Sequence, residues 1–484
     1  MSTLRGDVRT VSPLDSQRHT TVTSLVQILP ADKKRRWVPS QFNSRTIAED
    51  GNLIVWNSRS GAICVFNPAQ RQTVERLLSR QGVAGELDSL GRYLKDKGYL
   101  IPSDADELRQ FRTAFGQQHF RQDTLELILL ASEDCNFRCE YCYEDFKRGT
   151  MQPQVRSSIK KLVAKRVADG VRNLGVSWFG GEPLYGFAAI EDLGPYFVKM
   201  VEEHSLNYSV SMTTNGYLLS PDVADKLLSW RIKNFQITVD GTAEQHDRNR
   251  HGRDGGGTFE TIFFNLKMLK KRSDDFFVRI RINFDARSHP HLEDFLALVQ
   301  REFGGDSRYG VAFYGVGQWG GDNDANLDVC GQREVYQIQA KMEASALEKG
   351  IQFSTLGEKS GPGGQVCYAA RPYNFVIGAD GKVMKCTVSL DKQDNNIVGV
   401  LDEEGDLRLD DERYALWVEP VFETDKSCQI CYLLPSCQGL SCPLMRFSHN
   451  QSPCDATVKP NLRNKLVSTY AVKKAKARTV TVKS

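Results

Sequence analysis

The sequence predicts an α/β protein built on a partial parallel barrel, with a small N-terminal domain before it and a cysteine-rich region after it. Three observations support this prediction. Six apolar runs alternate with helical stretches between residues 125 and 316, as in parallel sheets covered by helices. A hairpin pattern followed by two short helices precedes this segment. Seven of the twelve cysteines lie after residue 360, where aliphatic periodicity is weak.

Length and composition limit the classes of protein that the chain can belong to. Its 484 residues suffice for several domains and a large core. Hydrophobic residues make up 40% and charged residues 25%, which excludes collagen-like, coiled-coil and wholly disordered chains. No apolar run approaches the ~18–20 residues of a membrane span. Residues 1–20 are polar and lack the apolar region of a secretory signal, so we expect a cytoplasmic protein.

The charge is balanced overall but not along the chain. Lys and Arg number 63 against 60 Asp and Glu, yet residues 459–484 carry eight basic residues and no acidic one. The rest of the chain is therefore mildly acidic, and we do not expect it to bind nucleic acid. We expect this basic tail to be solvated and frayed. The alternative is a tail that attracts an acidic peptide or nucleic acid.

Residues 21–118 have the pattern of a separate small domain, after a disordered N-terminus over residues 1–20. Two apolar runs within residues 52–67 flank a polar, Gly-containing turn, which predicts a hairpin. A further strand is expected near residues 22–29.

Two helices and an edge strand complete the N-terminal domain. Asn67 is expected to cap the first helix, with Pro68 at its first position. The second helix ends at Gly98, and a short edge strand follows over residues 99–102. Strands with two or three helices are compatible with a winged helix.

Residues 122–330 alternate strands and helices and are expected to form the partial barrel. The helical stretches have apolar residues three and four positions apart. Because the carboxyl ends of parallel strands meet at one edge, functional residues are expected there. The expected strands are residues 125–132, 176–179, 208–214, 235–239, 277–284 and 311–316, and the clearest helices are 155–167, 222–228 and 258–269.

Three cysteines with the spacing C-x3-C-x2-C follow the first barrel strand. They are Cys135, Cys139 and Cys142. Three thiolates on one loop can bind three irons of a 4Fe–4S cluster and leave the fourth iron open to a substrate or cofactor. The alternative is a structural zinc site. Zinc would need a fourth protein ligand, and residues 144–151 contain no Cys or His.

Small polar residues and glycines follow the next strands. Two glycines let a backbone approach a ligand closely, although turns use the same residues. Arg279 and Arg281 alternate with apolar residues on the fifth strand, and an Arg inside a barrel must find an anion. His246 also lies in this region, and an isolated histidine of this kind is more often structural than functional. The strand-end residues are Gly180, Gly181, Glu182, Thr214, Asn215, Thr238 and Asp240.

The cysteine loop and the Gly-Gly-Glu-Pro turn one strand later resemble the radical S-adenosylmethionine (radical SAM) superfamily. This resemblance implies a reduced cluster that binds the amino and carboxylate groups of SAM, and a 5′-deoxyadenosyl radical. It implies Glu182 as the partner of the SAM amino group and Tyr141 as the aromatic residue before the last cysteine. Contacts to the ribose and methionine parts are implied for Thr214, Asn215, Thr238 and Asp240, with Arg281 as a partner for a carboxylate.

The C-terminal cysteines resemble the SPASM domain, which binds two auxiliary 4Fe–4S clusters. The spacing departs slightly, with four residues between Cys437 and Cys442 where three are usual, and an early Cys454. A zinc ribbon is the alternative. By family pattern, Cys367, Cys386 and Cys442 would bind the first cluster, and Cys428, Cys431, Cys437 and Cys454 the second. Cys330 is a candidate fourth ligand for the first cluster or a buried, inert thiol.

The expected architecture is therefore a winged-helix-like domain over residues 21–118, a radical SAM barrel over 122–330, a SPASM domain over 331–458 and the basic tail. This combination resembles enzymes that crosslink ribosomally made peptides through thioether or carbon–carbon bonds, with a flavodoxin- or ferredoxin-like electron donor. The N-terminal domain would bind a leader peptide by strand addition, or would only shield the barrel. The rival functions are a formylglycine-forming sulfatase maturase and a non-catalytic iron–sulfur or zinc protein. The catalytic acid or base cannot be named from the residues.

Overall fold

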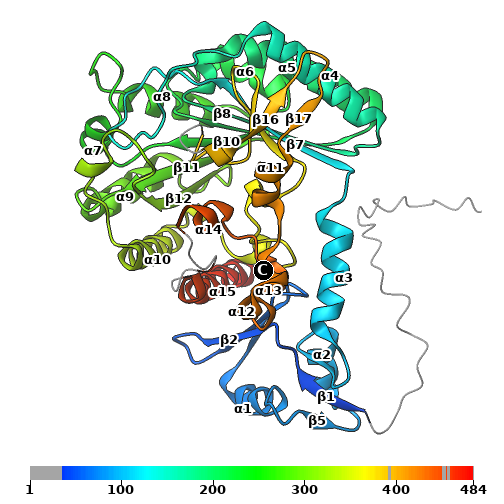
Figure 1. Cartoon of the computed structure of the whole chain (residues 1–484). Coiled ribbons are helices and arrows are strands. Elements are labelled where there is room, and N and C mark those ends of the chain that lie inside the picture. The colour runs from blue at the N-terminus through cyan, green and yellow to red at the C-terminus, as the bar shows by residue number, and fades with distance from the viewer. Residues whose placement is uncertain (1–34, 391–393, 450–453, 455–457, 483–484) are drawn as a thin grey trace, which may run out of the picture.

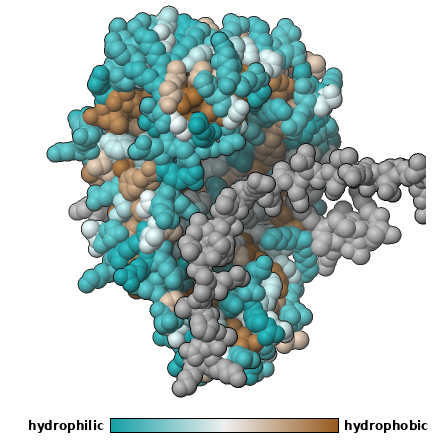
Figure 2. Space-filling model, turned by 90° about the vertical axis from the view of Figure 1, so that its right-hand side faces the viewer, coloured by the Kyte–Doolittle hydropathy of each residue, from teal (hydrophilic) through white to brown (hydrophobic). Residues whose placement is uncertain are grey.

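The computed structural model describes residues 35–390, 394–449, 454 and 458–482. A large α/β body contains the barrel, and a smaller body contains the N-terminal sheets; α3 (Glu107–His119) runs between them (Figure 1). Figure 2 shows the same two bodies from the side, with mostly hydrophilic side chains on the larger one. The expected disordered N-terminus and the strand near residues 22–29 lie outside the described residues.

The six expected barrel strands are confirmed, and neighbouring strands pair in parallel. On the first strand, Leu125, Leu127 and Leu129 are buried, while the alternate residues Glu126 and Ile128 face the barrel interior. The strands are β7 (Thr124–Ser132), β8 (Asn173–Gly180), β9 (Asn207–Thr214), β10 (Asn234–Thr238), β11 (Phe277–Phe284) and β12 (Tyr309–Gly315). The helices after them are α4 (Pro153–Ala168), α5 (Phe187–His204), α6 (Pro221–Ser229), α7 (Ala243–Asn249), α8 (Phe259–Lys270) and α9 (Leu292–Phe303).

The barrel sheet continues past residue 330, the expected end of the barrel. After α10 (Gln332–Glu348), β13 (Gln352–Phe353) adds to β12, and β14 (Asn374–Ile377) pairs in parallel with β7 at the opposite side. Three antiparallel strands follow β14. They are β15 (Lys382–Met384), β16 (Ile397–Leu401) and β17 (Leu407–Leu409). The C-terminal region therefore shares one eleven-stranded sheet with the barrel.

The N-terminal body confirms the expected hairpin, both helices and the edge strand. The Asn67 side chain accepts a hydrogen bond from the Gln70 amide and forms a capping box before Pro68, and Gly98 adopts a positive φ of 79° after the second helix. Three strands form one sheet: β2 (Asn43–Ile47), β3 (Leu53–Asn57) and β4 (Ile63–Phe66). A second sheet contains β1 (Arg36–Pro39), β5 (Val83–Ala84) and β6 (Leu100–Pro102); the helices are α1 (Pro68–Leu77) and α2 (Ser89–Asp96).

The expectation of a frayed basic tail is wrong for its described part. Residues Val458–Val482 form the helix α15, and Leu462 and Leu466 are buried against Trp56 of β3. Tyr470 and Lys474 each contact the Asp50 carboxylate at 2.6 Å, and these contacts hold the pKa of Asp50 well below its usual range. Apolar residues four apart give this basic segment a packing face.

In the part of the chain that the structure describes, four further helices follow β17 along the chain and precede α15. They are α11 (Asp411–Val418), α12 (Lys426–Gln429), α13 (Leu434–Cys437) and α14 (Pro443–His449). Among the described residues, no helix combines the length and apolar character needed to cross a bilayer.

An aromatic cluster joins the two bodies. Phe42 of the N-terminal body, Phe111 and Phe115 of α3, and Phe422 of the C-terminal region are all buried in it. The Phe422 ring lies 5.1 Å from the rings of both Phe111 and Phe115 in edge-to-face geometry. Trp56 adds a hydrogen bond from its indole N–H to the Ser360 carbonyl at 2.9 Å.

We expect Phe422→Ala to destabilise the contact between the two bodies by about 3–5 kcal/mol, because it leaves a cavity in a packed aromatic cluster. The side chain of Phe422 is 1% exposed, whereas that of Phe264 on α8 is 57% exposed. Phe264→Ala is therefore the matched control and should leave stability nearly unchanged. The measurement is the midpoint of the first urea unfolding transition. Equal midpoints for both variants would show that the cluster does not join the bodies.

Candidate functional site

The carboxyl ends of the barrel strands surround a cavity of about 150 Å³. Its wall contains ten of the residues singled out in the sequence, together with Phe137, Tyr143, Glu144, Phe146, Phe179, Thr213, Arg250 and Asn283. The ten are Cys135, Cys139, Tyr141, Cys142, Gly180, Gly181, Thr214, Asn215, Thr238 and Arg281. Glu182 and Asp240 are 0% exposed and lie behind this wall.

The cysteine loop is fixed on both sides. On one side, the amides of Arg138 and Glu140 donate to the carbonyls of His251 and Asn249 at 3.0 and 2.9 Å. On the other, Asn215 donates through its side-chain amide to the Asn136 side chain at 2.8 Å. The loop therefore presents its three thiols from a rigid backbone.

The three thiols fit a metal cluster. Cys135, Cys139 and Cys142 are free thiols, and burial raises the pKa of each, that of Cys142 to about 12. Each thiol is also affected by another of the three or by a nearby carboxylate. Such thiols stay protonated unless a cationic centre deprotonates them, which bound metal ions do. The donor set thus suits an iron–sulfur cluster, which would bind these three sulfur atoms.

Gly180 and Gly181 lie where the end of β8 passes very close to the end of β7 and the start of the cysteine loop. A Cβ on Gly180, whose φ is +123°, would lie 2.0 Å from the Ser132 carbonyl oxygen. A Cβ on Gly181 would lie 2.7 Å from the Asp134 carbonyl oxygen and 3.2 Å from the Cys135 Cβ. The sequence interpretation assigned these glycines to close approach by a ligand. In the structure these glycines also lie against the backbone of Ser132, the last residue of β7, and Asp134, while both of them line the cavity.

Glu182 connects β8 to β9. Its carboxylate accepts hydrogen bonds from the Thr214 hydroxyl at 2.6 Å, the Asn215 amide at 2.6 Å and the Leu184 amide at 3.0 Å. Burial raises the pKa of this carboxyl, and these three hydrogen bonds oppose that effect. Glu182 therefore positions Thr214 and Asn215 in the cavity wall and retains acceptor capacity for one further donor.

Tyr141 and Asp240 belong to one buried network. The Tyr141 hydroxyl donates to Asp240 and accepts from Arg250 at 2.7 Å and from the Asn283 side-chain amide at 2.9 Å. Asp240 also accepts from the Asn283 backbone amide at 2.9 Å. The network ties the cysteine loop to the ends of β10 and β11. Arg281 donates to the Asn283 side chain at 2.9 Å and lies 4.4 Å over the Tyr314 ring.

His246 is structural in this arrangement. It is 0% exposed, and its Nδ1 accepts a hydrogen bond from the Asp240 amide at 3.2 Å. Its Nε2 lies 3.1 Å from the Thr258 hydroxyl. Burial holds its pKa well below the usual value, so the ring is neutral.

The wall residues that sequence reasoning did not single out include Arg250, Asn283 and Glu144. Arg250 had a signal, because it lies in the polar run that follows the fourth strand, and Asn283 lies two residues after Arg281. Glu144 has a buried Oε2 atom with no hydrogen-bond partner among the described residues, and burial raises its pKa to about 8.

The C-terminal cysteines lie in two groups. Cys428, Cys431, Cys437 and Cys454 all line one cavity of about 80 Å³. The thiol of Cys367 is affected electrostatically by Cys442 and Cys386, and burial raises its pKa to about 11. Both groups are thiol-only donor sets.

Cys330 lies elsewhere. It is 8% exposed, and the groups that act on its thiol are Glu334, Asp285 and Asp328. Its sulfur lies near His289 and Glu334. The structure therefore does not bring Cys330 to the group of Cys367, Cys386 and Cys442.

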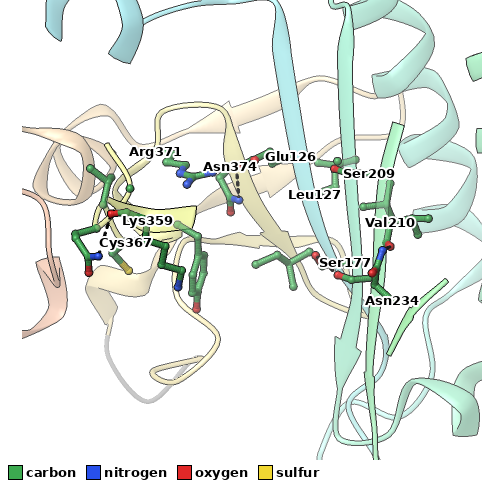
Figure 3. A pocket seen from close by; sticks show the side chains of 18 of the residues that line it. Glu126, Leu127, Ser177, Ser209, Val210, Asn234, Lys359, Cys367, Arg371 and Asn374 are labelled. Carbon is green, nitrogen blue, oxygen red and sulfur yellow. Dashed lines mark hydrogen bonds and ion pairs between the residues drawn. The ribbon is translucent and has the colours of Figure 1, made fainter. Parts of the chain in front are cut away.

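A polar chamber of about 660 Å³ lies inside the barrel (Figure 3). Ser177, Ser209 and Asn234 of the strands form one side, and Lys359 and Cys367 lie across from them. The Ser177 and Ser211 hydroxyls are 3.0 Å apart. Glu126 pairs with Arg371 at 3.1 Å and accepts from Asn374 at 2.9 Å.

The chamber lies directly next to the cysteine cavity on the same inner face of the sheet. Ser177 and Ser211 line the chamber, and Phe179 and Thr213, two residues further along the same strands, line the cysteine cavity. Two residues of a strand span ~6–7 Å. Residues of β8 and β9 therefore lead from one space into the other, and Cys367 lies at the chamber's opposite side.

A third cavity continues from the chamber toward α3. It measures about 790 Å³ and shares Glu126, Val366 and Arg371 with the chamber. Gln118 and His119, at the end of α3, line it. The end of α3 and the chamber thus lie on two sides of the shared residues Glu126, Val366 and Arg371.

Comparison with known proteins identifies the barrel. The Radical SAM superfamily matches residues 129–296. The radical SAM cyclopropyl synthase TigE of Paramaledivibacter caminithermalis is 24% identical over 208 residues, which cover 39% of this chain and 43% of that protein. The cysteine-type anaerobic sulfatase-maturating enzyme of Clostridium novyi is 28% identical over 174 residues, 34% of this chain and 45% of that protein. The chain thus matches less than half the length of these relatives.

A solved structure supports the same fold. Native anSMEcpe with bound AdoMet superposes with a TM-score of 0.56 at 18% identity, and the alignment covers 73% of this chain and 99% of that one. The superfamily match begins in β7 and ends in α9, so it includes the cysteine loop and the strand ends described above. Residues 129–296 of this chain therefore form a radical SAM domain.

Proposed function

We propose that this protein is a radical SAM enzyme that oxidatively crosslinks a ribosomally made peptide, through a thioether or a carbon–carbon bond. One observation carries the proposal: a polar chamber inside the barrel lies between the cysteine cavity and Cys367. A substrate segment in that chamber would have the SAM site on one side and a second thiol group on the other. An electron carrier needs no such chamber.

Cys135, Cys139 and Cys142 would hold the reduced cluster, and this cluster and SAM would together supply the radical chemistry, with the 5′-deoxyadenosyl radical as the hydrogen-abstracting species. The chain's own residues would bind SAM and orient it. Thr214, Asn215 and Thr238 line the cavity in which SAM would lie. Glu182 would accept a hydrogen bond from the SAM amino group while positioning two of these residues.

The crosslink requires a second acceptor of electrons. Joining a sulfur or carbon atom to a C–H carbon removes two hydrogen atoms from the peptide. One leaves with the deoxyadenosyl group, and the other leaves as a proton and an electron. We infer that Cys367, Cys386 and Cys442 hold an auxiliary cluster that accepts this electron, as in a SPASM domain. The group of Cys428, Cys431, Cys437 and Cys454 would hold the second cluster.

The N-terminal body would bind the leader part of the peptide, as a winged-helix-like domain. β4 is the edge strand of its sheet, and among the described residues no strand pairs with its outer side. The Asn57 amide donates to the Ala62 carbonyl at 3.0 Å, and Ile54 is opposite Val65. Because hydrogen-bonded pairs alternate in antiparallel sheets, the Val65 N–H points outward. An extended peptide could add a strand there.

Formylglycine formation is the second candidate, favoured by the sequence similarity to a sulfatase-maturating enzyme. Product analysis separates the two. A crosslinked peptide loses two hydrogens and keeps its sulfur, whereas a cysteine converted to formylglycine exchanges sulfur for oxygen.

The radical SAM assignment predicts a specific loss of iron and activity. Changing Cys135, Cys139 and Cys142 together to Ala should remove about four irons per chain and abolish 5′-deoxyadenosine formation after anaerobic reconstitution. The remaining iron should be retained, because the other thiols lie in separate groups. Iron analysis and chromatography of the nucleoside measure both effects. Cys64→Ala is the control and should change neither; a triple variant that still cleaves SAM would refute the assignment.

Glu182→Gln should weaken SAM binding about 10- to 100-fold, because a charge-assisted hydrogen bond contributes about 1.5–3 kcal/mol. Iron content should not change. Equilibrium dialysis with labelled SAM measures the affinity. Glu191→Gln is the matched control, because Glu191 is an exposed residue of α5 and pairs with Lys226 at 2.6 Å. An unchanged affinity in Glu182→Gln would leave Glu182 as a turn residue only.

Val65→Pro should weaken binding of the precursor peptide on the order of tenfold, because it removes an outward N–H and adds bulk at the strand edge. Val65→Ala keeps the N–H and should bind normally. Fluorescence anisotropy with a labelled candidate precursor peptide measures the affinity. SAM cleavage without peptide should be the same in both variants. Normal binding by Val65→Pro would exclude strand addition at β4.

A further inference from the structure

Three metal-ligating side chains meet on the flank of the barrel, apart from every thiol group described above. They are His289 in the 3-10 helix η2 (His289–His291), Cys330 just before α10, and Glu334 in the first turn of α10. Their ligand atoms all lie within 4.8 Å of one another, and His289 Nε2 is 4.0 Å from Glu334 Oε1.

The backbone brings these residues together. The amide of Ala286 donates to the Asp328 carbonyl at 2.9 Å, which joins the loop after β11 to the segment before α10. The His289 amide donates to the Asp285 carbonyl at 3.1 Å. The two segments that carry His289 and Cys330 are therefore held in register by hydrogen bonds that do not depend on the side chains themselves.

The surroundings of the thiol are acidic. Cys330 is 8% exposed and is affected by Glu334, Asp285 and Asp328, while Asp285 is paired with Arg287 at 3.0 Å. Glu334 Oε1 lies 4.0 Å from His289 Nε2, the outer limit of an ion pair, and the imidazole carries a charge only when it is protonated. An exposed pair of this length contributes little on its own. A cation between the three ligand atoms would satisfy all three at once.

The distances between these three ligand atoms suit a tetrahedrally coordinated ion once the atoms move slightly closer together. Zinc bonds of about 2.3 Å to sulfur and about 2.0–2.2 Å to nitrogen or oxygen place tetrahedral ligands roughly 3.3–3.6 Å apart. Glu334, whose side chain is 50% exposed, is free to rotate toward the other two. Thiolate, imidazole and carboxylate together are typical zinc ligands.

We propose that His289, Cys330 and Glu334 bind one zinc ion, with water as the fourth ligand. On binding, the Cys330 thiol releases its proton to solvent and the ion bonds to the thiolate, with no change of oxidation state. This proposal does not depend on the proposed peptide substrate.

The site would stabilise the rim of the cysteine cavity. Arg287, between Asp285 and His289, pairs with Glu140 of the cysteine loop at 2.9 Å. Asn323, from the segment that precedes Cys330, donates to the Glu140 carbonyl at 3.1 Å. An ion that crosslinks the segments of His289 and Cys330 would therefore restrain both contacts to the loop.

The test is zinc retention by the reconstituted full-length enzyme. After one equivalent of zinc chloride and anaerobic gel filtration, wild type should keep about one zinc per chain, by mass spectrometry of the metals. Cys330→Ser and His289→Ala should keep less than about one-tenth of that amount, with unchanged iron. His291→Ala, on the same 3-10 helix and outside the cluster, is the matched control and should bind zinc like wild type.

A second readout does not require a variant. Zinc should slow alkylation of Cys330 by iodoacetamide at least about tenfold, because the bound thiolate is not available to react. Cys64 in the N-terminal body is the internal reference, and its rate should not change. Equal zinc in wild type and Cys330→Ser, or alkylation of Cys330 that is independent of zinc, would overturn the proposal. Loss of iron in Cys330→Ser would instead assign Cys330 to an iron–sulfur cluster, and would also overturn it.

Discussion

The close approach of the chain at and after the end of β8 to the end of β7 is the constraint on which the site depends. At Gly180, Gly181 and Gly186, an added Cβ would lie 2.0, 2.7 and 2.1 Å from carbonyl oxygens of residues 131–134. The two segments can approach this closely only with glycine at these positions. It places Glu182 under the end of β9, and Glu182 then holds Thr214 and Asn215. Asn215 in turn holds the loop through Asn136, so the loop and the cavity wall are fixed by one closed set of contacts.

The second constraint is electrostatic. The three thiols of the loop, Glu144, Glu182 and Asp240 concentrate acidic groups around the cavity, and desolvation raises the pKa of each. Arg250 and Arg281 are the two arginines that line it. The polypeptide therefore does not favour three thiolates at once. A cluster of iron ions would supply the missing positive charge, which links the loading of the cluster to the final structure of the loop.

Much of the fold was predictable because local pattern and tertiary role agree. The runs that form β7 to β12 are apolar enough to be recognised, and the capping box at Asn67 marks its helix. The helix α15 was not predictable, because the many basic residues around Leu462 and Leu466 hide their apolar spacing. Their contact Trp56 also lies more than four hundred residues earlier in the chain. The two C-terminal thiol groups were implied by the resemblance to the SPASM domain. The cluster of His289, Cys330 and Glu334 was not predicted, because His289 comes from a different strand–helix loop. Only the folded sheet brings His289 near Cys330.

The polar chamber has a consequence for specificity. Small residues at alternate positions, Gly175 and Ser177 on β8 and Ser209 and Ser211 on β9, leave space where barrels usually pack large apolar side chains. Hydroxyl groups can satisfy the backbone of an extended segment without selecting its side chains. A chamber of this kind would accept many sequences. Under the proposed function, discrimination must then come from elsewhere, and the edge strand β4 offers outward-pointing main-chain groups and alternate side-chain positions to provide it. The cavity beside the chamber is lined by Gln118 and His119 at the last turn of α3, so the segment that follows a bound leader would reach the barrel along the helix that joins the two bodies.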